Sequence, residues 1–159
     1  MEDHAKTVAF TGHRHLEKKE LALIAQKLPP LLEKLYNTGY SVFRAGGALG
    51  FDTLAAEHVI KLRHLHPCIR LELILPHPAQ ARTWEEGDQR RYEEILQKAD
   101  RVKYISSYYY EGVLQERNRA LIRGADLCVA YLRTSHGGGA AYTAQFALRE
   151  GVELMNLYM

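Results

Sequence analysis

Three short segments of this chain carry residue types that bind an anion. Two are glycine-rich, Gly46–Gly50 and Gly137–Gly139, and the third reads Thr-Gly-His-Arg over residues 11–14. Glycines let backbone N–H groups approach an anion closely, and a helix that begins just after them adds free N–H groups and a partial positive charge. Arg14 can add a forked, charge-assisted contact to a phosphate or carboxylate. Together the segments predict a site for a phosphorylated small ligand, and a nucleotide fits this chemistry best.

Each segment follows a stretch that is typical of a β-strand. Short apolar runs alternate along the chain with longer stretches of helical periodicity. The expected strands cover Thr7–Phe10, Ser41–Arg44, Arg70–Leu75, Arg101–Ile105, Leu127–Leu132 and Glu153–Leu157. The expected helices run from Leu21 to Leu35, from Phe51 or Asp52 to about residues 64–67, and over Glu86–Ala99, Gly112–Arg123 and Ala141–Glu150. We expect Pro29 and Pro30 to kink the first helix or to make it restart, because proline removes amide donors.

This alternation predicts one α/β domain over residues 1–159. Its sheet is expected to be doubly wound, mostly parallel and Rossmann-like, with helices on both faces in three layers. Ligands in such folds bind outside the carboxyl ends of the strands, where the three segments lie. The expected ligand-binding residues are Thr11, Gly12, His13, Arg14, Gly46, Gly47, Gly50, Asp52, Arg117, Asn118, Ser135, Gly137, Gly138, Gly139 and Thr143.

Four of the polar residues have two interpretations. Asp52, at the start of a helix, either complements the helix dipole or accepts hydrogen bonds from a ribose or base. Glu57 is either a helix-surface residue in an ion pair or a catalytic carboxylate. Arg117 and Asn118 either form an exposed helix face or reach the ligand or a second subunit.

Several familiar sites are absent from the sequence. Gly46-Gly47-x-x-Gly50 lacks the spacing of the dinucleotide fingerprint, and no Gly-Lys-Ser/Thr follows either glycine segment, so no cofactor is identified. The eight histidines form no ligand set with cysteine or acidic residues, so we expect no metal. Cys68 and Cys128 lie in apolar surroundings, which favours buried, reduced side chains.

Charge and hydropathy restrict the partners. The chain has 21 basic and 19 acidic residues, a net charge of +2, which disfavours a nucleic-acid partner. The polar N-terminus predicts no signal peptide, and no apolar stretch is long enough for a membrane span. We expect a cytoplasmic protein without membrane contact.

The segments Thr11–Arg14 and Gly46–Glu57, with Arg117-Asn118 and Asp126, resemble the SLOG superfamily, and in particular its YpsA-like branch. This Rossmann-like superfamily includes DprA and the LOG enzymes, and the resemblance extends from Thr7 to Leu157. It implies a ligand site at the two glycine segments, nucleotide-derived ligands and homodimers. The LOG enzymes hydrolyse the N-glycosidic bond of a nucleoside monophosphate with the help of a glutamate in a Pro-Gly-Gly-x-Gly-Thr-x-x-Glu segment. The corresponding segment here begins at His136 and has no carboxylate before Glu150.

Three functions follow as hypotheses. The first is a module, a sensor or regulator, that binds a nucleotide or a nucleotide-derived phosphorylated ligand. The second is a LOG-like hydrolase of nucleoside monophosphates, with Asp52 and Glu57 as the candidate catalytic residues. The third is an interaction protein, with self-association included, that uses Tyr108–Tyr110 and Trp84 as its surface.

Overall fold

Strands and helices alternate along the chain from β1 to β6. The computed structural model describes residues 5–133 and 138–158. The strands are β1 (Lys6–Gly12), β2 (Tyr40–Ala45), β3 (Arg70–Leu75), β4 (Arg101–Tyr104), β5 (Leu127–Tyr131) and β6 (Glu153–Asn156). The helices are α1 (Lys18–Asn37), α2 (Phe51–Leu65), α3 (Glu86–Lys98), α4 (Val113–Ile122) and α5 (Gly138–Arg149).

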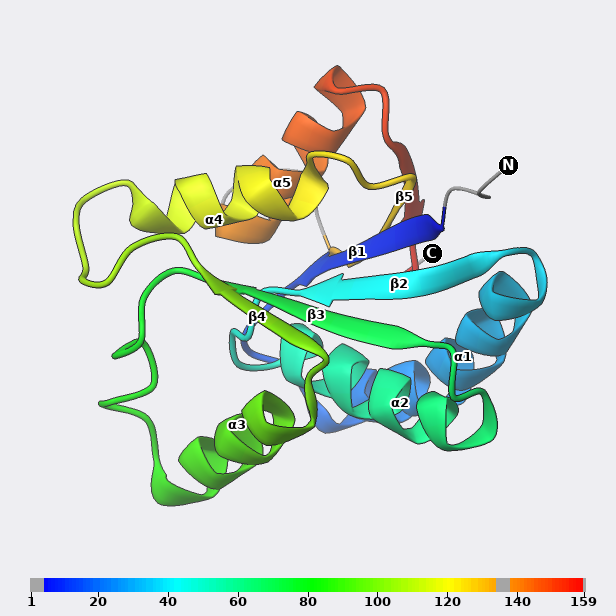
Figure 1. Ribbon diagram of the computed structural model, residues 1–159, viewed down its shortest axis with the longest axis horizontal. Coiled ribbons are helices and arrows are strands. Elements are labelled where there is room, and N and C mark those ends of the chain that lie inside the picture. The colour runs from blue at the N-terminus through cyan, green and yellow to red at the C-terminus, as the bar shows by residue number, and fades with distance from the viewer. Residues whose placement is uncertain (1–4, 134–137, 159) are drawn as a thin grey trace.

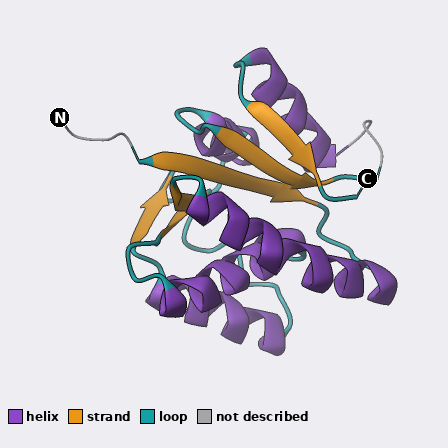
Figure 2. Ribbon diagram, turned by 90° about the vertical axis from the view of Figure 1, so that its right-hand side faces the viewer, coloured by secondary structure: helices purple, strands orange, loops and turns teal. Residues whose placement is uncertain are grey.

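The six strands form one parallel sheet in the order β4-β3-β2-β1-β5-β6. Helices α1, α2 and α3 cover one face, and α4 and α5 cover the other (Figure 1). Figure 2 shows the sheet between the two layers of helices. The predicted doubly wound, Rossmann-like α/β fold is therefore confirmed.

The larger part of the core lies between the sheet and α1–α3. Phe10 of β1 stacks on Phe43 of β2 with ring centroids 6.1 Å apart, and its ring meets the edge of Phe51 at 6.2 Å. All three rings are fully buried. Because Phe51 is the first residue of α2, this packing holds the start of that helix against the carboxyl end of β1.

Two sequence-based expectations are corrected in part. The alternative of a restart at Pro29 and Pro30 is wrong, because helix α1 continues through both residues. The residues whose carbonyls lose their amide donors, Ala25 and Gln26, are exposed, so water can satisfy those carbonyls. Cys128 is buried as expected, but Cys68 is exposed in the turn before β3.

Candidate functional site

A cleft of about 340 Å³ lies outside the carboxyl ends of β1 and β5. The chain leaves β1 toward α1 on one face of the sheet and leaves β5 toward α5 on the other, so the two connections diverge at this point. A topological switch point of this kind is where parallel α/β sheets bind ligands. The described residues that line the cleft are Thr11, Gly12, His13, Arg14, Ala48, Asp52, Leu114, Arg117, Asn118, Leu121, Gly138, Gly139 and Ala140.

Two arginines bring positive charge to this cleft. Arg14 is exposed, and within the described parts of the chain its guanidinium has no hydrogen-bond or ion-pair partner. Arg117 of α4 is only 5% exposed. Its Nη1 donates to the carbonyl of Gly46 at 2.5 Å and its Nε to Oδ1 of Asn118 at 2.9 Å. These bonds hold the Arg117 side chain in one orientation, and no described residue accepts from its Nη2.

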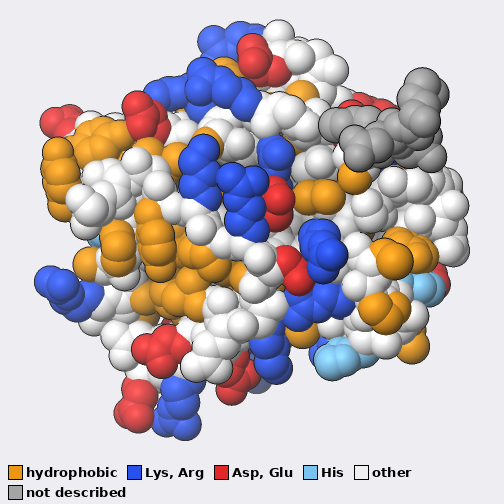
Figure 3. Space-filling model, in the orientation of Figure 1, with side chains coloured by type: hydrophobic (Ala, Val, Ile, Leu, Met, Phe, Trp, Pro, Cys, Tyr) orange, Lys and Arg blue, Asp and Glu red, His pale blue; other side chains and the backbone are white. Residues whose placement is uncertain are grey.

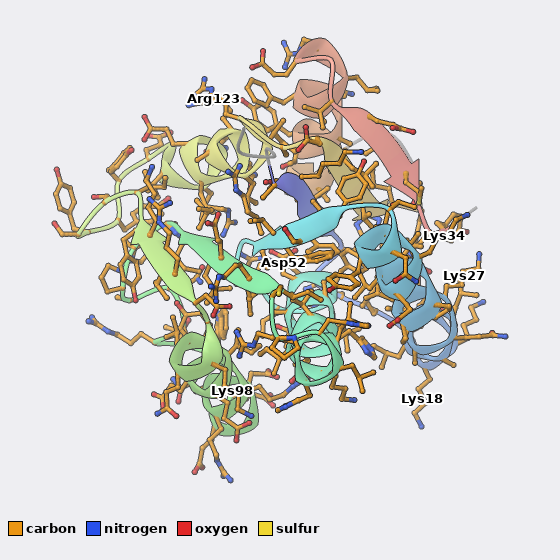
Figure 4. The ribbon with its side chains drawn as sticks, turned by 45° about the vertical axis from the view of Figure 1, so that its right-hand side comes forward. Lys18, Lys27, Lys34, Asp52, Lys98 and Arg123 are labelled. Carbon is orange, nitrogen blue, oxygen red and sulfur yellow. The ribbon has the colours of Figure 1, made fainter. Side chains whose placement is uncertain are left out.

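Asp52 is the carboxylate among the described lining residues. It lies at the inner end of α2, 6% exposed, whereas Lys18, Lys34 and Lys98 extend outward from the molecule (Figure 4). Its Oδ2 accepts from the N–H of Ala48 at 3.3 Å. Burial raises the pKa of the Asp52 carboxyl to about 6, although the positive charges of Arg117 and Arg14 lower it. Burial in turn lowers the pKa of Arg117, against the opposing effect of Asp52.

Three glycines allow the close approach of the loops that carry these groups. A Cβ on Gly12 would lie 2.6 Å from the Phe51 ring, and one on Gly46 would lie 2.9 Å from Oδ2 of Asp52 and 3.1 Å from Nη1 of Arg117. Gly50 has a φ of +79°, and a Cβ there would collide with the carbonyls of His13 and Arg14. The Phe51 N–H donates to the carbonyl of His13 at 3.1 Å. The loop after β1 therefore lies directly against the start of α2, which places Arg14 beside Asp52.

His13 connects this loop to the end of β5. Its Nε2 accepts from the N–H of Arg133 at 3.0 Å, and its ring lies edge-on to Tyr131 at 6.5 Å. Burial, with the nearby charge of Arg133, lowers the pKa of His13. The imidazole is thus held neutral at physiological pH, with a structural hydrogen bond on Nε2.

An ion pair behind His13 secures the same region. Arg133 donates from Nε and Nη2 to the two carboxylate oxygens of Glu20 at 2.6 and 2.7 Å, and Tyr131 donates its hydroxyl to Oε2 at 2.8 Å. These hydrogen bonds lower the pKa of Glu20 to about 2 although the side chain is buried. This network was not predicted from the sequence, because Glu20 and Arg133 are 113 positions apart and no local pattern connects them.

The cleft brings together many of the residues expected from the sequence but not all of them. Thr11, Gly12, His13, Arg14, Asp52, Arg117, Asn118, Gly138 and Gly139 line it. Gly46, Gly47, Gly50 and Thr143 are not among its lining residues, and the Thr143 hydroxyl donates to the carbonyl of Gly139 at 2.8 Å. Ser135 and Gly137 lie outside the described residues.

Glu57 lies elsewhere on α2. It forms a two-bond ion pair with Arg91 of α3, at 2.6 and 2.9 Å, in a separate groove of about 320 Å³.

Apolar lining residues on α4 were also not predicted from the sequence. Leu114, Arg117, Asn118 and Leu121 are spaced by three and four residues, so they share one face of the helix, and this spacing was a signal that could have identified the leucines.

The aromatic residues that the third hypothesis uses as an interaction surface lie outside the cleft lining. Tyr108 and Tyr109 are 67% and 61% exposed. The Tyr110 hydroxyl donates to Glu116 of α4 at 2.5 Å, and Trp84 packs edge-on against Tyr92 at 5.3 Å.

In the described ranges no group of His, Cys, Asp and Glu could hold a metal ion, and no helix is long and apolar enough to cross a membrane.

Comparison with known proteins shows a family match over nearly the whole chain. The sequence pattern of the YspA SLOG family matches residues 8–154. A UPF0398 protein of Halalkalibacterium halodurans is 31% identical over 147 residues, which cover 86% of this chain and 78% of that protein. UPF0398 proteins of Bacillus pumilus and Bacillus cereus are 30% and 27% identical, over 86% and 92% of this chain and 78% and 84% of their own lengths.

Proposed function

The chain belongs to the YspA SLOG family, and on that premise we propose that it binds a nucleotide or a nucleotide-derived phosphorylated ligand in the cleft between β1 and β5. One observation carries the proposal. The exposed Arg14 and the buried Arg117 line the same cleft as Gly138 and Gly139, the first residues of α5. Two guanidinium groups and a helix N-terminus together favour the binding of a phosphate group through charge-assisted hydrogen bonds.

Asp52 makes a nucleotide a better fit than a simple anion. A site for inorganic phosphate gains nothing from a carboxylate, whereas Asp52 can accept hydrogen bonds from a ribose hydroxyl or a base amino group. The volume of about 340 Å³ is near the lower end of the usual range for small-molecule sites. It favours a ligand the size of a mononucleotide.

The test is calorimetric titration with nucleoside mono-, di- and triphosphates, NAD and ADP-ribose, with an unphosphorylated nucleoside as the ligand control. We expect at least one phosphorylated ligand to bind and the nucleoside to bind far more weakly. Arg14→Ala should weaken binding about 10- to 100-fold, because a charge-assisted hydrogen bond contributes about 1.5–3 kcal/mol. Arg90→Ala, at an exposed position of α3, is the matched control and should leave binding unchanged. No binding by any phosphorylated ligand, or equal binding by Arg14→Ala, contradicts the proposal.

A second candidate function is hydrolysis of the N-glycosidic bond of a nucleoside monophosphate. The observation in its favour is a carboxyl group in the cleft with a pKa of about 6, which still carries a proton in part of the molecules near neutral pH. In this reaction Asp52 donates its proton to the base nitrogen as the bond to C1′ breaks. Water then adds to C1′ and gives up one proton, which restores the carboxyl group of Asp52. The products are free base and ribose 5-phosphate.

Release of free base, followed by chromatography, tests this candidate. Asp52→Asn should abolish release, and Glu57→Gln should not, because Glu57 is paired with Arg91 in another groove. If none of the common nucleoside monophosphates releases its base, the hydrolase is rejected and the binding function stands by itself.

A further inference from the structure

Strand β4 is an exposed edge of the sheet. It pairs only with β3 within the described sheet, and all four of its residues are exposed. Its N–H and C=O groups on the outer side are therefore free to pair with another extended chain. An edge strand of this kind can accept an added strand, which is one of the common modes of peptide recognition.

The two faces of β4 carry different side chains. Arg101 and Lys103 pair in register with Glu72 and Ile74, on the face toward α4. Val102 and Tyr104 pair with Leu73 and Leu75, which belong to the core on the side of α3. Val102 and Tyr104 are 36% and 39% exposed, unusually high for such side chains beside a core. In Figure 3 basic side chains lie between the positions of α4 and β4, and a hydrophobic area lies between β4 and α3.

The basic side of β4 borders a groove of about 260 Å³. The groove is lined by Arg44, Glu72, Ile74, Arg101, Lys103, Ala120 and Arg123. Glu72 is held by Arg44 at 3.2 Å and lies 4.0 Å from Arg101. Lys103 has no hydrogen-bond or ion-pair partner in the described part of the chain. Four positive side chains thus face one carboxylate, so the groove attracts negative charge.

We propose that β4 docks an extended segment of a partner protein in which acidic and apolar residues alternate. Alternate side chains of a strand point to opposite faces, and those on one face are about 7 Å apart. An added strand with this pattern places its acidic side chains opposite Arg101 and Lys103 and its apolar side chains opposite Val102 and Tyr104. Each face of β4 then meets the chemistry that complements it.

Two other occupants fit the edge less well. A second copy of β4, paired antiparallel about a two-fold axis, would bring Arg101 and Lys103 of each copy face to face, and like charges in directly opposite positions are destabilising. A nucleic acid would satisfy the basic groove but would leave Val102 and Tyr104 exposed. Only the alternating peptide accounts for both faces.

The test uses a fluorescein-labelled peptide with the core Glu-Val-Glu-Ile-Glu-Val, followed by fluorescence anisotropy. Its controls are the same residues in a blocked order and the same peptide N-methylated at alternate positions on the edge that pairs with β4. We expect the alternating peptide to bind at least about tenfold more tightly than either control, since the blocked order puts charge on both faces and N-methylation removes ladder hydrogen bonds.

Variants of the protein separate the two faces. Lys103→Glu should weaken binding about tenfold or more, because it replaces attraction by repulsion. Val102→Thr, which keeps the shape and the strand propensity, should weaken it about threefold, the effect of one lost apolar cross-strand contact. Lys18→Glu makes the same charge change at the start of α1 and should leave binding unchanged. Circular dichroism confirms that each variant is folded.

Three results would overturn the proposal. The first is equal binding of the alternating and blocked peptides. The second is tighter binding of an oligouridylate RNA that depends on Lys103 and not on Val102, which would assign the groove to nucleic acid. The third is a dimer in light scattering that Val102→Thr or Lys103→Glu alters, which would assign the edge to a second copy.

Discussion

Arg14 and Arg117 bring charge of the same sign to one cleft in two different ways. Arg14 is exposed and has no partner among the described residues, so its charge is available to a ligand but partly screened by water. Arg117 is buried and held by Gly46 and Asn118, so its orientation is set before any ligand arrives. A preorganised donor loses little conformational entropy on binding. For the proposed ligand we therefore predict that Arg117 orients the phosphate group and that Arg14 captures it.

The buried Asp52 should leave a signature in the pH dependence of stability. Its pKa is raised from 3.8 to about 6 in the folded state, so the folded protein holds this proton more tightly than the unfolded chain. The contribution of Asp52 to stability is complete below about pH 4 and is lost as pH rises through 6. The cost of ionisation reaches about 3 kcal/mol at pH 7, from about 1.4 kcal/mol per pKa unit.

Asp52→Asn removes this pH dependence. We expect the free energy of unfolding of the variant, relative to the natural chain, to rise by up to about 3 kcal/mol between pH 4 and pH 7. Urea unfolding of both proteins at several pH values measures it. The comparison across pH isolates the titration of Asp52 from any constant cost of leaving Arg117 without its carboxylate. A difference that stays constant with pH would show that folding does not shift the pKa of Asp52.

At the scale of elements, the site depends on how closely the loop after β1 approaches the start of α2. Gly50→Ala should lower the free energy of unfolding by more than about 1 kcal/mol, because its φ is +79° and its Cβ would meet two carbonyl oxygens. It should also weaken ligand binding by displacing Arg14.

Gly87→Ala is the matched control for that prediction. Gly87 lies in α3, where an added Cβ would meet no described atom within 4 Å, and alanine favours helix by about 0.5–1 kcal/mol. We expect Gly87→Ala to leave binding unchanged and the unfolding midpoint equal or higher. If Gly50→Ala and Gly87→Ala change the free energy of unfolding equally in chemical denaturation, then Gly50 is not needed for the contact between the loop after β1 and the start of α2.

The link between α1 and β5 rests on Glu20. Its pKa of about 2 lies below the ordinary 4.5, so its ionised form stabilises the fold above pH 4.5, and this stabilisation is lost as pH falls toward 2. Glu20→Gln should cost about 2 kcal/mol at pH 7, the scale of hydrogen bonds to a charged group, and less at pH 3. Glu93→Gln, at an exposed position of α3, is the control. Thermal unfolding at pH 7 and pH 3 measures the loss of stability in Glu20→Gln. An equal loss at both pH values would contradict the assignment of the ion pair.

Local patterns in the sequence predict the elements well and their connections poorly. The apolar run Leu127–Leu132 is visible locally. So are the polar residues Arg14 and Asp52, which follow predicted strands, and Arg117, which lies in a helical stretch. The continuity of α1 is not visible in the local sequence. It depends on the burial of Ile24, Leu28 and Leu32 against the sheet, which outweighs the local effect of Pro29. The pairing of Glu20 with Arg133 is not visible in the local sequence either, because only the folded chain brings these two residues together.

At the scale of the whole molecule, the strand order places the cleft and the β4 edge at different parts of the sheet. The cleft lies where β1 meets β5, and β4 is the outermost strand on the far side of β2 and β3. A net charge of +2 is compatible with both sites, because each uses a few basic side chains locally rather than an extended basic surface. Ligand binding and peptide docking should therefore be separable by mutation: Arg14→Ala affects the first and Lys103→Glu the second.

The most direct measurement for the central claim is a crystal structure of the protein soaked with the nucleotide that binds most tightly in the calorimetric panel. We predict a phosphate group within hydrogen-bond distance of the Arg14 and Arg117 guanidinium groups and of the first N–H groups of α5, with Asp52 facing the ribose or base. A phosphate bound elsewhere on the protein, with this cleft filled only by water, would contradict the account.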